Sequence, residues 1–392
     1  MEKKKRTVLQ CTNGKVGAVA TNIPYEVVAF SDRKLKPSIY IYSFPSMTKR
    51  AKLKGNAQLD YTLLEFSYSG IYLASYSAIP EHEVTLWNWE TKVILCRRSQ
   101  PGMEVSQMTF NPMNWRQLCL SNTKFVTIWN IERCNTDHYF KPKPVNLPTE
   151  DGTFIKEFEG LFSQGLKDPF YGPVLPLSAV AGLVGIEAEN FKPKDHFRPL
   201  LHPIAHCWNS TNDLYVCCEE GHILFINGEN LLDGTLHSIT IKENNYTIKD
   251  HISVHASVKN IVFSPDYTQI LLLTENGSVF YYTFDEKTKI ETILDASGGN
   301  IQAIDFVTLG NQYCMSISIL GEFCIWLIED GSPVSRLCLK TEVNDMASCP
   351  SSLSVAVGTT EGSMLFLDIS TLQSPRLVHK ILLTNSCIQH VR

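Results

Sequence analysis

Short apolar segments recur along the chain, and each is separated from the next by a turn rich in serine, asparagine, proline or glycine. Clear examples are LEFSYSGIYLASYS, MTFNPMNWRQLCLS and IVFSPDYTQILLLTENGSVFYYTF. Five stretches share the order strand, Ser/Asn-containing turn, strand, Gly/Asn-containing turn and aromatic strand: 64–89, 108–131, 261–284, 304–328 and 346–369. Short apolar runs bounded by turn residues, with no helix-length periodicity between them, predict a β-meander that is repeated several times.

The repeat has a period in the forties. Phe66 and Phe110 lie 44 residues apart, and Phe263 and Phe306 lie 43 apart, which matches the roughly 40 to 45 residues of a four-stranded propeller blade. Two weaker copies, at 16–44 and 204–226, follow the same pattern. The strands are apolar on both faces, as expected of sheets that stack between other sheets. We therefore predict an all-β fold, a β-propeller of about seven four-stranded WD-like blades with a partly helical insertion.

One interval breaks the period. Phe110 and Cys207 lie 97 residues apart, more than two blade lengths, so about 50 residues are inserted between them. Four apolar residues of this interval fall at the i, i+4, i+7 and i+8 positions of one helical face: Phe154, Phe158, Leu161 and Phe162. The spacing predicts a short amphipathic helix, and 178–191 is a candidate for a second one. These helices either pack against the ring or bind a protein partner.

The predicted organisation has three parts. Residues 1–136 form the first blades, 137–202 the insertion with short helices, and 203–392 the remaining blades, with a shortened unit near 228–258. The shortened unit is expected because Cys207 and Phe263 lie 56 residues apart, too far for one repeat and too near for two. The chain starts on a closing-strand pattern, MEKKKRTVLQC, and ends on an opening-strand pattern, CIQHVR, so we expect a shortened form with a blade number of seven, give or take one.

Composition and charge narrow the possible partners. The net charge of -5 provides no basic field for a phosphate backbone, so no nucleic-acid partner is expected. No apolar stretch approaches the roughly 18 residues needed to cross a bilayer, and no membrane partner is expected. The first 20 residues lack the apolar core of a secretory signal, so we expect a cytoplasmic location in which the 12 cysteines are reduced thiols.

The residues that could bind a metal or a phosphate, or act in catalysis, lack the sequence motifs that such sites need. The histidines that lie close to another histidine or a cysteine have no second ligand pair for a metal: His202, His206 with Cys207, His251 and His255. The stretch 160–167, GLFSQGLK, does not have the order of a phosphate-binding loop, and Ser297 lies outside a nucleophile-elbow frame. We therefore predict no catalytic residue, no cofactor and no metal, and hence a protein that is not an enzyme.

With catalysis not expected, the protein is predicted to bind other proteins. The turn after Pro112 contains the residues best suited to such binding. Trp115 and Arg116 are adjacent there, and tryptophan and arginine are enriched among the residues that dominate binding energy at protein interfaces. The alternative is that Trp115 packs over its own hairpin. The predicted partner-binding residues are therefore Trp115 and Arg116, together with the apolar face of the inserted helix at Phe154, Phe158, Leu161 and Phe162.

Four stretches of the chain resemble the WD-repeat region of the cilia- and flagella-associated protein family: 19–44, 110–121, 171–185 and 349–359. The resemblance covers nearly the whole chain, the insertion included. It implies a structural protein of the axoneme in motile cilia and sperm flagella, part of the cytoskeleton, that helps to tether an inner dynein arm to doublet microtubules. The implied partners are axonemal: other WD-repeat tether subunits, inner-arm dynein and the doublet microtubule.

The chain departs from this family and from its repeat consensus in ways that affect the prediction. We expect this form to lack an upstream segment and the coiled-coil half that would span distance in a tether. Asparagine follows Trp87 and Trp129, and Leu327 follows Trp326, where a WD repeat has aspartate. We therefore expect the buried polar network of standard blades to be absent and the blades to cohere through apolar packing. Two other readings of the fold stay open: a cytosolic adaptor or trafficking scaffold, and a hydrolase with polar groups that converge at the central channel.

Overall fold

The computed structural model describes residues 16–148 and 201–391, apart from positions 69, 101, 210–211, 228–247, 255, 265–267, 284–289, 295–299, 309–310, 351 and 390. The chain divides into two compact units, one made of residues 1–145 and 202–392 and the other of 146–201. The predicted helices in the insertion, with Phe154, Phe158, Leu161 and Phe162, lie outside the described residues. The part of the chain that the structure describes contains no helix long and apolar enough to span a membrane.

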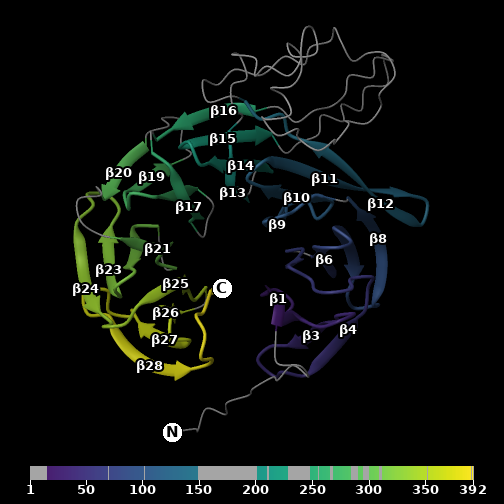
Figure 1. Ribbon diagram of the computed structural model, residues 1–392. Coiled ribbons are helices and arrows are strands. Elements are labelled where there is room, and N and C mark those ends of the chain that lie inside the picture. Colours follow the sequence, from purple (N-terminus) through teal and green to yellow (C-terminus); the bar gives the residue numbers. More distant parts are fainter. Residues whose placement is uncertain are drawn as a thin grey trace, which may run out of the picture. The chain divides into compact units, whose positions relative to one another are not determined.

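The first unit is a ring of seven four-stranded antiparallel sheets, as Figure 1 shows. In each sheet the four strands follow one another in chain order, so every sheet is a meander and forms one blade. The prediction of a seven-bladed β-propeller is confirmed. The first strand of each blade lies nearest the centre of the ring (Figure 1), and from blade 1 to blade 7 each first strand packs against the first strand of the following blade.

Three blades precede the insertion. Blade 1 contains β1 (Val16–Asn22), β2 (Val27–Asp32), β3 (Ile39–Ser43) and β4 (Lys49–Leu53). Blade 2 contains β5 (Leu63–Phe66), β6 (Tyr72–Ser77), β7 (Glu83–Asn88) and β8 (Val93–Ser99). Blade 3 contains β9 (Gln107–Phe110), β10 (Gln117–Asn122), β11 (Phe125–Cys134) and β12 (Asp137–Pro144).

Four blades follow the insertion. Blade 4 contains β13 (Pro203–Trp208), β14 (Asp213–Cys218), β15 (His222–Asn227) and β16 (Ile248–Ser253), and blade 5 contains β17 (Val258–Phe263), β18 (Gln269–Thr274), β19 (Val279–Thr283) and β20 (Ile290–Leu294). Blade 6 contains β21 (Ile301–Phe306), β22 (Tyr313–Ser318), β23 (Glu322–Leu327) and β24 (Pro333–Cys338). Blade 7 contains β25 (Val343–Ser348), β26 (Ser354–Thr359), β27 (Ser363–Asp368) and β28 (Arg376–Leu382).

In blades 1 to 3 a buried small or polar residue closes the inner strand. Ser67 and Asn111 follow the aromatic anchors of blades 2 and 3, and Asn22 takes the same place in blade 1. The Oδ1 atom of Asn22 accepts a hydrogen bond from the Tyr25 N–H at 3.0 Å, and that of Asn111 accepts one from the Met113 N–H at 2.9 Å. These side chains close the turn to the second strand, which is the usual role of Asn and Ser in turns.

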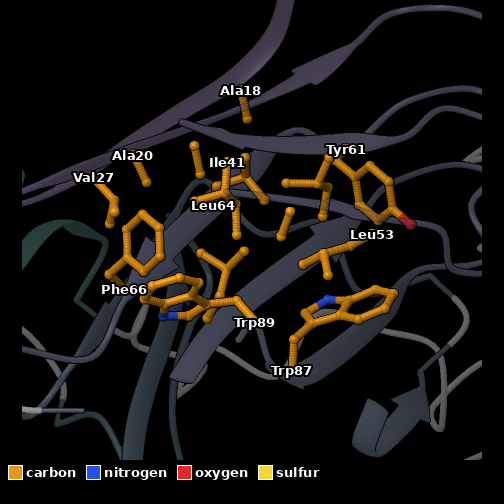
Figure 2. Packing of buried hydrophobic residues seen from close by; sticks show 14 of the residues in the cluster. Ala18, Ala20, Val27, Ile41, Leu53, Tyr61, Leu64, Phe66, Trp87 and Trp89 are labelled. Carbon is orange, nitrogen blue, oxygen red and sulfur yellow. The ribbon is translucent and has the colours of Figure 1, made fainter. Parts of the chain in front are cut away.

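The junction between blades 1 and 2 is apolar. Blade 1 contributes small side chains such as Ala18 and Ala20, and blade 2 contributes Phe66, Trp87 and Trp89. Both tryptophans are 1% exposed, and Figure 2 shows them beneath the side chains of blade 1. The small side chains of blade 1 leave room for the large side chains of blade 2, since protein interiors are close-packed.

Two tryptophans also take part in polar contacts that the sequence analysis did not expect. The indole N–H of Trp87 donates a hydrogen bond to Ser75 Oγ at 2.9 Å, and that of Trp326 donates to Ser316 Oγ at 2.8 Å. The expectation that such buried polar contacts would be absent is therefore wrong for blades 2 and 6, because the serine partner is retained where the aspartate is not. In blade 3, Leu120 occupies the register position of these serines.

The junction between blades 3 and 4 is polar as well. The buried His206 ring is within hydrogen-bond distance of Ser121 Oγ (Nδ1, 2.6 Å) and of Thr109 Oγ1 (Nε2, 2.8 Å). Its backbone N–H donates to Gln107 Oε1, and Gln107 Nε2 donates to the His206 carbonyl, both at 2.8 Å. Burial lowers the pKa of His206 to about 3, so the imidazole is neutral near pH 7. The expectation of purely apolar cohesion is wrong at this junction.

Candidate functional site

The turn between β9 and β10 is held in one conformation by its own side chains. Asn111 is buried, and its Oδ1 accepts hydrogen bonds from the N–H groups of Met113 and Asn114, while its Nδ2 donates to Gln117 Oε1 at 2.8 Å. Asn114 Oδ1 in turn accepts the Arg116 N–H at 3.1 Å. This network of short-range bonds is encoded in the sequence NPMNWRQ and gives the turn a fixed shape.

The turn presents the two predicted partner-binding residues side by side. Trp115 is half-buried and stacks on Tyr72 of blade 2, with ring centroids 3.9 Å apart and an interplanar angle of 19°. The Arg116 guanidinium is exposed and lies 5.7 Å from the Trp115 ring. Trp115 also lies 6.3 Å from the ring of His138 in its own blade. It therefore bridges two blades rather than packing over its own hairpin alone, and part of its ring remains accessible.

His138 contributes no charge to this turn near neutral pH. Burial lowers its pKa, and the positive charges of Arg133 and Arg116 lower it further. The charge described next to the Trp115 indole is therefore that of the Arg116 guanidinium and not that of His138.

Exposed apolar side chains continue from this turn across the corresponding turns of blades 1 and 2. Tyr68 follows β5 and is 61% exposed, Phe44 follows β3 and is 60% exposed, and Ile23 follows β1 and is 66% exposed. We call this set the aromatic turn surface and define it by six residues: Ile23, Tyr25, Phe44, Tyr68, Met113 and Trp115.

Direct contacts hold these turns together. Asn22 Nδ2 donates to the Ser67 carbonyl at 2.8 Å, which ties the first turn of blade 1 to that of blade 2. The Phe44 N–H donates to the Glu26 carbonyl at 2.7 Å, which ties the two turns of blade 1 to each other. Tyr25 meets Trp89 of blade 2 edge to face at 6.0 Å. The surface is therefore a pre-organised platform and not a set of independent loops.

The chemistry of the aromatic turn surface suits protein binding. The four turns that build it carry two charged residues, Glu26 and Arg116. Contiguous exposed apolar side chains on a folded protein commonly mark an interaction site, and rigid aromatic anchors dominate binding energy at such sites. Of the six residues of this surface, the sequence analysis identified only Trp115, with Arg116 beside it. The missed signal was an aromatic or aliphatic residue at a turn position where polar residues are usual, as at Phe44 and Tyr68.

Other parts of the described chain have fewer features of a binding site. A cavity of about 550 Å³ lies beside the β2–β3 and β6–β7 turns, and its lining includes Arg33, Lys34 and Asp60. Its charges are already paired, Arg33 with Asp60 at 3.2 Å and Lys34 with Asp32 at 2.5 Å. Among the residues that the structure describes, no group of three His, Cys, Asp or Glu side chains is placed to hold a metal ion.

The chain is similar to known proteins in sequence and, separately, in fold. Mouse cilia- and flagella-associated protein 43 is 48% identical over 100% of this chain, and its Xenopus laevis counterpart is 41% identical over 99%. These matches cover 25% and 26% of the relatives, so the chain spans about a quarter of their length. The structure of Saccharomyces cerevisiae Sqt1 covers 96% of this chain and 87% of its own, with a TM-score of 0.62 and 9% identity, and supports the fold alone. No family model matches the chain. On the identity that extends over its whole length, the chain belongs to the WD-repeat cilia- and flagella-associated protein family.

Proposed function

We propose that the protein is a non-enzymatic WD-repeat scaffold in the axoneme of motile cilia and sperm flagella, within the cytoplasm and its cytoskeleton. The relatives that it resembles are named as cilia- and flagella-associated proteins, and the similarity extends over the whole chain. The observation that carries a binding role is the aromatic turn surface, a rigid and nearly uncharged platform across three blades.

The finer part of the proposal concerns the partners. The scaffold helps to tether an inner dynein arm to doublet microtubules, and it contacts other WD-repeat tether subunits, inner-arm dynein or the doublet itself. A rigid ring whose neighbouring turns are bonded to one another supports this role, because it presents several anchors without an entropic cost of ordering them on binding.

Two ionisable groups with shifted pKa values, Asp305 and His206, support a structural rather than a catalytic role. Burial raises the pKa of Asp305, and its two carboxylate oxygens accept the N–H groups of Phe306 and Ser348, both at 2.8 Å. The two ring nitrogens of His206 are likewise engaged by hydroxyl groups. Perturbed groups of this kind mark an active site when they face a cleft, whereas these two hold adjacent blades together.

The proposal is tested by asking whether the protein is found in axonemes and whether high salt releases it from them. The tagged protein is expressed in multiciliated cells or spermatids, and axonemes are extracted with high salt. We expect the wild-type protein to stay with the axoneme and the variant Tyr68→Ala/Trp115→Ala to be released. Tyr139→Ala is the matched control, because Tyr139 is a 44% exposed tyrosine on β12 outside the aromatic turn surface. Wild-type protein in the soluble fraction would contradict the axonemal role and favour a cytosolic adaptor.

A further inference from the structure

Two turns of blade 3 meet beside the Trp115 indole. One is the β9–β10 turn, which carries Trp115 and Arg116, and the other is the β11–β12 turn. Arg133 on β11 and His138 on β12 lie opposite each other in the register next to this second turn. The rings of Trp115 and His138 are 6.3 Å apart. We call the set Trp115, Arg116, Arg133 and His138 the arginine corner.

Two positive charges converge at the arginine corner. The Arg116 guanidinium lies 5.7 Å from the centre of the Trp115 ring. Burial lowers the pKa of His138, and the charges of Arg133 and Arg116 lower it further. Because the interaction between charges weakens with distance and is screened by salt, both guanidinium groups lie near the same imidazole. Within the described part of the chain, no carboxylate lies within ion-pair distance of either arginine.

The guanidinium groups have hydrogen-bond donors that no described residue uses. Arg133 Nε donates to the Asn135 carbonyl at 2.7 Å, which leaves the two terminal nitrogens of the group. The backbone of Arg116 is fixed where its N–H donates to Asn114 Oδ1 at 3.1 Å, and its side chain is exposed. Guanidinium N–H groups match the geometry of a carboxylate and make strong, charge-assisted hydrogen bonds to it. The arginine corner can therefore bind an anionic group.

An apolar surface adjoins these donors. The Trp115 ring stacks on Tyr72 of blade 2, with centroids 3.9 Å apart, so one face of the indole is held in place. Met113, two positions before Trp115, is 63% exposed. A ligand that places an anionic group at Arg116 and Arg133 therefore brings its neighbouring side chain to an exposed apolar surface.

The other charged groups in this region favour a ligand with a single negative charge. Asp137 raises the pKa of His138, so its carboxylate also lies near the corner. In blade 2, the β7–β8 turn carries Glu90 and Lys92, whose opposite charges offset each other. A phosphate group carries nearly two negative charges at pH 7, so Asp137 would repel it about twice as strongly as it repels a carboxylate. The side chain of an aspartate or glutamate therefore fits best.

The chain itself has no suitable acidic segment beside the corner. Residues 1–15 contain five basic residues and one acidic residue, and residues 383–392 contain no acidic residue. The insertion leaves blade 3 beyond Pro144, at the far end of the eight-residue strand β12. At about 3.4 Å per residue, this point is about 24 Å from the β11–β12 turn. A second polypeptide is therefore the better source of the carboxylate.

We infer that the arginine corner binds an acidic side chain of a protein partner, next to a large apolar residue that packs on Trp115 and Met113. The carboxylate accepts hydrogen bonds from the guanidinium groups of Arg116 and Arg133. The inference rests on the proposed function, because Trp115 belongs to the aromatic turn surface, and it names the chemistry that the partner needs there.

A carboxylate at the corner also changes the protonation of His138. An anion beside the imidazole favours its charged form, so the bound state has a higher pKa at His138 than the free state. The complex then binds more protons than the free protein, and affinity increases as the pH falls. A neutral ligand has no such effect.

The first test uses the purified 392-residue protein and three fluorescent peptides with the sequence Gly-Ser-Leu-X-Leu-X-Gly-Ser. The residue X is glutamate, glutamine or phosphoserine, and binding is measured by fluorescence anisotropy. We expect the glutamate peptide to bind at least about tenfold more tightly than the glutamine peptide, because one charge-assisted hydrogen bond changes an equilibrium by about that factor. Equal binding, no binding of any peptide, or tighter binding of the phosphoserine peptide would overturn the inference.

Variants of the protein assign the preference to the corner. Arg116→Gln/Arg133→Gln should abolish it, whereas the matched control Lys54→Gln/Lys124→Gln, which removes two charges from exposed loops elsewhere, should keep it. Circular dichroism checks that each variant is folded. Arg116→Lys/Arg133→Lys, which keeps the charge without the planar group, replaces the glutamine variant if that one unfolds and should weaken the preference. A preference that survives the changes at both arginines, or that the control also loses, would overturn the inference.

The pH dependence gives an independent measurement. We expect the glutamate peptide to bind more tightly at pH 6 than at pH 7.5, and the glutamine peptide to bind equally at both. In His138→Gln the difference for the glutamate peptide should disappear. An unchanged difference in this variant would show that no anion binds beside His138.

The second test distinguishes failure of this inference from failure of the proposed function. The photoreactive amino acid benzoylphenylalanine replaces Met113 in ciliated cells, captured peptides are identified by mass spectrometry, and retention in axonemes is measured in the same cells. We expect a captured segment of a partner with aspartate or glutamate beside an apolar residue. Retention with capture of a segment that has no acidic residue, or of residues 149–200 of this chain, would overturn the inference alone. A protein that is not retained, but still prefers the glutamate peptide when purified, would contradict the proposed function alone.

Discussion

Two junctions of the same ring are held together by different physics. Between blades 1 and 2, Trp87 and Trp89 are buried in one cluster with apolar side chains of blade 1, and the interface depends on apolar burial. Between blades 3 and 4, His206 of blade 4 bonds to hydroxyl and amide groups of blade 3, and every polar atom of the contact needs its partner. An apolar junction tolerates changes of pH and is damaged by lost volume, whereas a buried polar junction is sensitive to protonation and to the loss of a single partner.

The largest effect should come from lost volume at the apolar junction. Trp87→Ala removes a 1% exposed indole, and we expect the free energy of unfolding to fall by about 3–5 kcal/mol. Denaturant titration followed by circular dichroism measures this loss. Trp115→Ala, which removes a half-buried indole, is the comparison and should cost clearly less. Equal losses in the two variants would contradict the assignment of Trp87 to a tightly packed core.

The polar junction should respond to pH. Because burial lowers the pKa of His206 to about 3 while the unfolded value is near 6.5, the unfolded chain binds more protons between these values, and stability falls as pH decreases. We expect a loss of about 2 kcal/mol between pH 7 and pH 5 from this residue. The measurement is the denaturation midpoint at each pH. In His206→Gln, which cannot titrate, the dependence should be smaller by that amount. An unchanged dependence would show that His206 is not the group responsible.

A smaller loss of stability should follow when the tryptophan of blade 2 or blade 6 loses its serine partner, which blade 3 does not have. Ser75→Ala leaves the buried Trp87 N–H without an acceptor, and we expect a loss of about 1 kcal/mol, at the lower end of the cost of an unpaired buried donor. Ser316→Ala should act in the same way through Trp326. Thermal unfolding compares these variants with Ser46→Ala, which alters an exposed turn. If the three variants unfold at the same temperature, the serine bonds do not contribute to blade stability.

The smallest effect should be at an exposed ion pair, which serves as the reference for the buried polar junction. Arg376→Ala removes the partner of Asp368 on the outer edge of blade 7. Side-chain hydrogen bonding from Ser370 and the ion pair with Arg376 lower the pKa of Asp368 to about 2, but solvent and salt screen such contacts. We expect no measurable change in the denaturation midpoint at physiological ionic strength. A loss as large as that of Ser75→Ala would contradict the contrast between buried and exposed polar contacts.

Local chemistry explains what could be predicted from the sequence. The anchors Phe66 and Phe110 and the turn residues after them recur at a nearly constant interval, and each turn is closed by hydrogen bonds between residues only two to six positions apart. Strand order, blade number and the position of Trp115 and Arg116 in a turn follow from such short-range patterns.

Contacts between distant residues explain what could not be predicted. Ser121 and His206 are 85 positions apart, and the aromatic turn surface joins residues from Ile23 to Trp115 that share no sequence pattern. Whether the face of a strand is covered depends on the blade that lies beside it, because an apolar residue in a strand has the same local pattern whether its neighbour is protein or solvent. The sequence alone determined the repeating blade and its turns, and the tertiary structure decided which blades meet, which polar groups find partners and which faces stay open.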